Sequence, residues 1–317
     1  MASQASRTVV YAALAGNLAI AATKFVAAWF TGSSAMLSEA IHSLVDTSNQ
    51  GLLLIGFRRA ARPPTADHPF GHGMEIYFWG FVVALLVFSL GGALSIYEGI
   101  RRLSEHEPMT GAWVNFAVLG AALIIESLSL RVAWRELRAQ QPEGSWLSAV
   151  RGSKDPGIFA IFCEDAAALG GLSIALIGVS LAYFLDMPIF DAIASIAIGV
   201  LLVFVAAFLA RETLSLMTGE SASVEVLADV RAVLNSDSRV VSVDEILSMH
   251  LGPEEILVAI AIDFRDEMTS VEIEAAALEL GEMLKRKQPA IARVYMRPLR
   301  HRDAMGATEP VPEAGSA

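Results

Sequence analysis

Six stretches of about 20 mostly apolar residues occupy the first two thirds of the chain, and they constrain its fold more than any other feature. A helix of that length crosses a hydrocarbon layer roughly 30 Å thick. Of the 317 residues, 54% are hydrophobic, and the mean hydropathy of +0.52 exceeds that of ordinary soluble domains. The sequence therefore predicts an α-helical membrane protein, with spans at residues 8–30, 34–57, 77–99, 112–134, 157–183 and 189–211.

The distribution of Lys and Arg indicates how these spans are oriented. The loops after the second and fourth spans carry several Lys and Arg residues, whereas the turns after the first and fifth spans carry none. We therefore expect both termini in the cytoplasm, although Arg101 and Arg102 after the third span argue against this orientation. The N-terminal MASQASR has neither a cleavable signal pattern nor an Arg-rich transit peptide, which favours a bacterial inner (plasma) membrane.

The composition becomes charged and periodic near residue 213. Residues 223–236 and 271–287 predict amphipathic helices, the second of which opens with Thr269 and Glu272 in capping-box spacing. Residues 246–252, 256–264 and 291–298 predict strands. The order α-β-β-α-β is typical of a small ferredoxin-like or metallochaperone-like α+β domain. Residues 213–300 contain fifteen Asp and Glu against nine Lys and Arg, a net charge of −6. This acidic surface suits the collection of cations and argues against nucleic acid as a partner.

Four ionisable side chains in two of the apolar spans are the main candidates for a functional site. His42 and Asp46 belong to the second span, and Glu164 and Asp165 to the fifth. A charge in mid-bilayer costs a few kcal/mol or more unless it meets a partner, an ion or water. His42 and Asp46 share one helix face, and an imidazole beside carboxylates suits a divalent transition ion. The pattern predicts either a metal site between two helices or a hydrogen-bond cluster that binds nothing.

Several segments carry a more specific signal: TGSSAMLSEAIHSLVDTSNQ, DHPFGHGMEIYF, PIFDAIASIAIGVLL and the α-β-β-α-β region. Together they resemble the cation diffusion facilitator family of divalent-metal transporters, and HSLVDTSNQ, RGSKDPG and EDAAALGG resemble its zinc transporter nine-like branch. The resemblance implies a homodimeric secondary transporter, in contact with membrane lipid, that exports a divalent cation in exchange for H⁺ by alternating access. Zn²⁺ is the first candidate ion, and Mn²⁺, Fe²⁺, Co²⁺ and Cd²⁺ are further candidates.

The same resemblance implies a transport site at the membrane midplane. His42, Asp46 and Asp165 match three of the family's ligands, whereas Ile161 stands where the family has a histidine and cannot ligate. An oxygen ligand in place of that histidine would favour Mn²⁺ or Fe²⁺ more than the full family pattern does. The candidates for the missing ligand are Glu164, which points about 100° away from Asp165 around the helix, and Asn49, Asn17 or water.

A second metal site is implied in the loop after the second span. His68 and His72 match the family's H-x-x-x-H spacing there, and Asp67 adjoins them. The same DHPFGHG segment is also compatible with a well-formed turn that binds nothing. In the last predicted strand, Met296 and Arg297 occupy positions where the family would place ligands, which argues against metal sensing by this domain while leaving dimerisation expected.

Further charged residues lie in the spans. Lys24 in the first span is expected to face Glu39 or Asp191 in a structural ion pair. Glu126 in the fourth span has no matched ligand, and a role as a proton carrier stays open.

The chain is thus expected to contain an N-terminal cytoplasmic segment (1–7), a six-helix transmembrane transport domain (8–212), a cytoplasmic α+β dimerisation domain (213–300) and a disordered tail (301–317). The alternative is a membrane-anchored regulatory or interaction protein whose degenerate site no longer transports, which Ile161 supports. No paired nucleophile and base points to an enzyme.

Overall fold

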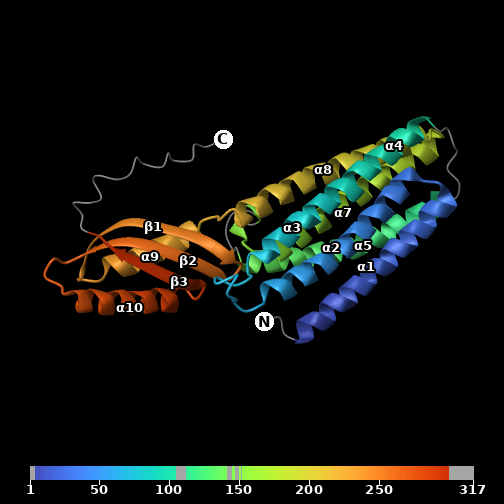
Figure 1. Ribbon diagram of the computed structural model, residues 1–317. Helices are drawn as coiled ribbons and strands as arrows, with labels where there is room; N and C mark the ends of the chain where they lie inside the picture. The colour runs from blue at the N-terminus through green and yellow to red at the C-terminus, as the bar shows by residue number, and fades with distance from the viewer. Residues whose placement is uncertain (1–3, 105–111, 141–144, 147–149, 151, 300–317) are drawn as a thin grey trace. The chain divides into compact units, whose positions relative to one another are not determined.

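Long helices form the first of two units into which the chain divides, residues 1–217 and 218–317 (Figure 1). The computed structural model describes residues 4–104, 112–140, 145–146, 150 and 152–299, so the predicted tail at 301–317 lies outside the described residues. The helices of the first unit are α1 (Gln4–Thr31), α2 (Ser34–Ala60), α3 (Glu75–Leu86), α4 (Leu94–Ser104), α5 (Ala112–Gln140), α7 (Pro156–Leu185) and α8 (Ile189–Met217). A π-helix, η1 (Val87–Ala93), joins α3 to α4.

Four helical segments among the described residues are long and apolar enough to cross a membrane, which makes this an integral membrane protein. They are Glu75–Ser104, Trp113–Arg135, Pro156–Leu185 and Ile189–Met217, and they overlap the third to sixth predicted spans. Helices α1 and α2 coincide with the first two predicted spans. Helix α2 contains ionisable side chains, which make it less apolar than the four segments just named. Helix α1 already begins at Gln4, so it includes part of the predicted N-terminal segment 1–7.

The third predicted span is interrupted by the π-helix, which the sequence did not indicate. Glycines there let the chain approach α8 closely. A Cβ atom added to Gly92 would lie 2.7 Å from Cγ2 of Val203, and one added to Gly99 would lie 2.6 Å from Cγ1 of Ile196. The backbones of α3, η1 and α4 therefore pack against α8 at a distance that larger side chains would prevent.

The start of α2 is tied to the start of α8 by Asp191. Its carboxylate accepts hydrogen bonds from the Ser33 hydroxyl (2.7 Å), from the backbone N–H (2.6 Å) and hydroxyl (2.9 Å) of Ser34, and from the backbone N–H of Ala35 (3.3 Å). The first N–H groups of a helix have no intrahelical partner. Asp191 supplies that partner from another helix, and the hydroxyl of the N-cap residue Ser33 accepts from the backbone N–H of Met36 at 3.0 Å, so both residues stabilise the start of α2.

The second unit contains α9 (Val224–Asn235), β1 (Val240–Gly252), β2 (Glu255–Phe264), α10 (Ser270–Lys287) and β3 (Ile291–Pro298). The sheet order is β1-β2-β3, with β1 antiparallel and β3 parallel to β2. Every second residue of β2 joins the buried residues of α9 and α10 in one apolar cluster, so both helices cover the same face of the sheet. Strand β1 begins six residues before the predicted start and contains register irregularities, which apolar alternation alone does not reveal.

Helix α10 starts at the predicted capping box. The Thr269 hydroxyl accepts from the backbone N–H of Glu272 (3.4 Å), and the Glu272 carboxylate accepts from the backbone N–H of Thr269 (2.7 Å). Two otherwise unpaired N–H groups are thereby satisfied, as this motif requires.

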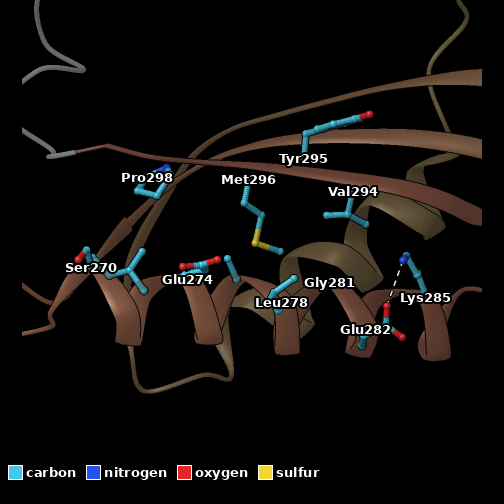
Figure 2. A pocket seen from close by; sticks show the side chains of 12 residues that line it. Ser270, Glu274, Leu278, Gly281, Glu282, Lys285, Val294, Tyr295, Met296 and Pro298 are labelled. Carbon is cyan, nitrogen blue, oxygen red and sulfur yellow. Dashed lines mark hydrogen bonds and ion pairs between the residues drawn. The ribbon is translucent and has the colours of Figure 1, made fainter. Parts of the chain in front are cut away.

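Side chains of β3 alternate between α10 and the opposite side of the strand. Figure 2 shows Val294 and Met296 pointing toward α10, while Tyr295 points away. Together with Leu278 of α10 they border a groove of about 620 Å³. The Met296 position, where the family resemblance would place a metal ligand, therefore presents an apolar thioether to this groove.

Candidate functional site

A small cavity lies among α1, α2, α5 and α7 of the first unit. Its internal volume of about 10 Å³ is close to what one water molecule needs. The cavity is lined by Asn17, Ile20, Ser43, Asp46, Gln50, Glu126, Ile161, Glu164 and Asp165. Four carboxylates from three helices therefore border a space the size of a single small ion or water.

Helix α2 contributes polar atoms that the rest of the protein does not satisfy. Nδ1 of His42 lies 3.6 Å from Oδ1 of Asp46, and the two side chains are 1% and 13% exposed. Within the described residues, neither ring nitrogen of His42 nor Oδ1 of Asp46 or Asn49 has a hydrogen-bond partner. Buried polar atoms are rarely left unpaired because the loss of water is not compensated. These atoms are therefore free to bind an ion or water.

Helix α7 contributes two carboxylates that neutral donors hold in place. Nδ2 of Asn49 donates to Oε1 of Glu164 at 2.8 Å, and the Ser129 hydroxyl donates to Oδ2 of Asp165 at 2.8 Å. Each bond engages one oxygen of its carboxylate and brings no opposite charge. Neither donor would neutralise a carboxylate at these positions, so both side chains are potential ligands for a cation.

A lysine lies behind the cavity wall. Nζ of Lys24 donates to Oε2 of Glu39 at 3.2 Å and to the hydroxyl of Ser43 at 2.7 Å. Glu39 is thus one of the two partners expected for Lys24, whereas Asp191, the other one, caps α2. Since Ser43 also lines the cavity, the Lys24–Glu39 pair supports the cavity from outside.

The cavity unites only part of the predicted transport site. Asp46, Glu164, Asp165 and Asn17 line it, whereas His42 and Asn49 contact lining residues without being among them. No three His, Cys, Asp or Glu side chains in the described part of the chain are already close enough together to hold a metal ion. The structure therefore shows an ion-sized cavity bordered by potential ligands, without a completed coordination shell.

Several lining or supporting residues were not assigned to the site from the sequence, among them Glu126, Gln50 and Ser129. Glu126 did carry a signal, because an acidic residue within an apolar span needs an explanation. Gln50 and Ser129 carried none, because a polar uncharged residue is common on membrane helices.

The predicted loop site is an ordered turn with two adjacent histidines. The ring centroids of His68 and His72 lie 4.4 Å apart. Nδ1 of His72 lies 3.1 Å from Oε1 of Glu75, whose other oxygen is 3.7 Å from Nη1 of Arg59. Backbone hydrogen bonds in both directions between Thr65 and His68 close the turn, while the third predicted ligand, Asp67, is exposed. The segment thus forms the well-ordered turn expected from its sequence, and it also places two imidazole rings close enough together to be a potential pair of metal ligands.

Spanning helices around a carboxylate-lined cavity define an integral membrane protein with ionisable side chains inside its helical unit, which in general marks a functional site. The profile of the cation efflux transmembrane domain matches residues 10–218, and the chain therefore belongs to the cation efflux, or cation diffusion facilitator, family. The sequence predicted that the chain belongs to the zinc transporter nine-like branch of this family. The similarity to the proton-coupled zinc antiporter SLC30A9 of Mus musculus confirms this prediction.

The similarity to individual relatives differs in extent. The mouse antiporter, whose name includes "mitochondrial", is 34% identical over 76% of this chain and 43% of its own length. Metal tolerance protein C4 of Arabidopsis thaliana is 31% identical over 84% of this chain and 58% of its own. The cation-efflux pump FieF of Klebsiella pneumoniae is 23% identical over 88% of this chain and 91% of its own. The chain thus spans less than half the length of the mouse relative.

Proposed function

We propose that this protein transports a divalent metal cation, with Zn²⁺ as the first candidate, and exchanges it for protons. The observation that carries the proposal is the ion-sized cavity in which Asp46 of α2 meets Glu164 and Asp165 of α7. The names of two relatives, a proton-coupled zinc antiporter and a cation-efflux pump, support the same activity. A secondary transporter, rather than an enzyme, is the activity that this family and this cavity favour.

The exchange for protons follows from the chemistry of the potential ligands. An imidazole nitrogen and a carboxylate must be unprotonated to bind a metal ion, so protons and the ion compete for His42, Asp46 and Asp165. Protonation from one side of the membrane then favours release of the ion on that side. Alternating exposure of the cavity to the two sides would convert this competition into antiport.

The transport unit that we propose has six spans within residues 8–212, followed by a domain at 213–300 on the side where both termini lie. The acidic second unit would collect cations and pair with a second copy in a homodimer. The predicted bacterial inner membrane finds no support in the relatives, one of which is named as mitochondrial. The proposal therefore specifies an integral membrane location without choosing a bacterial or an organellar membrane.

A flux assay in proteoliposomes tests this function. We expect purified full-length protein to move Zn²⁺ faster when a pH gradient is imposed, and Asp46→Ala to abolish that flux while the protein keeps its elution volume. Competition among Zn²⁺, Mn²⁺, Fe²⁺, Co²⁺ and Cd²⁺ identifies the preferred ion. Undiminished flux in Asp46→Ala would overturn the site assignment.

The alternative, a membrane-anchored regulatory protein with a degenerate site, is favoured by the isoleucine at position 161 and by the incomplete ligand shell. The same flux assay distinguishes a transporter from a regulatory protein. Binding of Zn²⁺ without flux in the wild-type protein would support the regulatory role, whereas pH-driven flux excludes it.

A further inference from the structure

Glu126 of α5 enters the cavity from a helix that the predicted transport site did not include. The carboxylate lines the same small space as Asp46, Glu164 and Asp165. Among the described residues, no side chain donates a hydrogen bond or forms a salt bridge within 4 Å to Glu126, whereas Asn49 and Ser129 hold the other two acidic side chains of the α5–α7 wall. Glu126 is thus a partly buried carboxylate with a free coordination capacity.

The position of Glu126 on α5 follows from helix periodicity. Leu119, Ala122 and Ala133 are the buried positions nearby, at 0–6% exposure, and they lie seven and four residues before and seven residues after Glu126. Spacings of four and seven place side chains on one helix face. The neighbours Ile124 and Leu128, at 64% and 60% exposure, point outward. Glu126 therefore belongs to the single face of α5 that packs inside the helical unit.

A second observation indicates that this cavity takes a ligand. His42 is 1% exposed, and within the described residues neither of its ring nitrogens has a hydrogen-bond partner; Nδ1 lies 3.6 Å from Oδ1 of Asp46, which also lacks a hydrogen-bond partner and belongs to a residue of the cavity wall. An acidic cluster that only stabilised helix packing would leave no such atoms unsatisfied. The wall also contains Ile161, the position at which the family pattern has a histidine.

We propose that Glu126 supplies the ion ligand that Ile161 cannot, so that the transported cation is bound by carboxylates from three helices, α2, α5 and α7. This inference rests on the proposed function and adds a third helix to its site. An oxygen ligand in place of an imidazole shifts preference from Zn²⁺ toward harder ions such as Mn²⁺. Glu126 is thus a binding and specificity-determining residue.

Calorimetric titration of the full-length protein in detergent with Zn²⁺ and with Mn²⁺ tests the inference. We expect Glu126→Gln, which keeps the shape but loses the charge, to weaken binding of both ions by at least about 10-fold, because even loss of an interaction that only orients a ligand costs about 10–100-fold in metal affinity. The adjacent Ser127→Ala serves as the control, because the Ser127 hydroxyl is exposed and donates to the Leu123 carbonyl of its own helix, so both affinities should stay unchanged.

A rescue variant distinguishes a ligand from a structural residue. Ile161→His restores the family's histidine on the same cavity wall, so the double variant Glu126→Gln, Ile161→His should recover Zn²⁺ affinity to within about threefold of wild type and Mn²⁺ affinity less well. If Glu126 had only a structural role, Glu126→Gln would lower the melting temperature, and an imidazole at position 161 on another helix would not restore ion affinity. Wild-type affinity in Glu126→Gln, or failure of the rescue in a folded double variant, would overturn the inference.

The outcomes also separate this inference from the proposed function. If the wild-type protein transports, Asp46→Ala abolishes transport and Glu126→Gln binds normally, only the role of Glu126 is wrong. If Glu126→Gln weakens binding but the wild-type protein shows no flux, the ligand assignment is supported and transport is refuted.

Discussion

Nζ of Lys24 lies 3.2 Å from Oε2 of Glu39, and neither side chain is exposed. This ion pair joins α1 to α2, and the same ammonium donates to the hydroxyl of Ser43 on the cavity wall. Removing a single member of a buried pair leaves an uncompensated charge, which costs far more than replacing both members. The pair therefore makes the position of α2, and of the site residues on it, sensitive to one substitution in α1.

Lys24→Met should destabilise the protein by about 3–5 kcal/mol, because Glu39 is left charged and unpaired. Thermal unfolding of the purified protein in detergent measures the effect. The double variant Lys24→Met, Glu39→Gln should recover much of the loss, since no full charge stays buried. A melting temperature equal to wild type in Lys24→Met would show that the pair contributes nothing to stability.

Asp191→Ala should destabilise the start of α2, because two backbone N–H groups and two hydroxyls lose their acceptor together. A buried donor left without a partner costs about 1–3 kcal/mol, so we expect a clear fall in melting temperature. Asp186→Asn is the matched control, because Asp186 is exposed and has a positive φ of 51° that asparagine also tolerates. Equal melting temperatures for the two variants would contradict the capping role of Asp191.

His72→Ala should remove one equivalent of bound Zn²⁺ if the turn at residues 65–72 holds metal. The proximity of the two imidazoles, with ring centroids 4.4 Å apart, is the reason for this expectation. The stoichiometry of binding in an Asp46→Ala background, in which only the loop site would remain, is the measurement. Unchanged stoichiometry would instead support a turn that His68 and His72 build without metal.

Thr269→Ala should expose the first turn of α10 and raise its amide hydrogen exchange at pH 7, measured by mass spectrometry on the full-length protein. Loss of such a cap costs about 0.5–2 kcal/mol. The adjacent Ser270→Ala, which leaves the capping box intact, is the control. Exchange at the wild-type rate in Thr269→Ala would show that the box is dispensable.

The same cap has a defined pH dependence. The backbone N–H of Thr269, and next its hydroxyl, hold the pKa of the Glu272 carboxyl below its usual value. A depressed pKa in the folded state gives stability that is present above the unfolded pKa and is lost as the pH falls through the folded pKa. The protection of the first turn of α10 from hydrogen exchange, corrected for the intrinsic exchange rate, should therefore decrease as the pH falls from the unfolded-state pKa of Glu272 through its folded-state pKa. The decrease should be smaller in Glu272→Gln, which lacks the titrating carboxyl group.

Much of the fold was predictable because it depends on local patterns. The long apolar stretches predicted the helices of the first unit, and the capping box at Thr269 and Glu272 predicted where α10 begins. The π-helix at residues 87–93 was not predicted, because it accompanies the close approach of Gly92 and Gly99 to α8. Contacts between segments about 100 residues apart leave no periodic trace in either segment.

The sequence by itself determined that this protein is integral to a membrane, that it belongs to a cation efflux family, and that His42, Asp46, Glu164 and Asp165 needed a partner there. Only the tertiary structure decided which carboxylates share a cavity. Asp46 and Asp165 meet Glu126 because α7 packs against both α2 and α5, and each of the three helices turns a carboxylate toward the same cavity. The rotation of each helix about its axis depends on its packing against neighbours, and one chain's pattern of hydrophobicity does not encode which inward faces will meet.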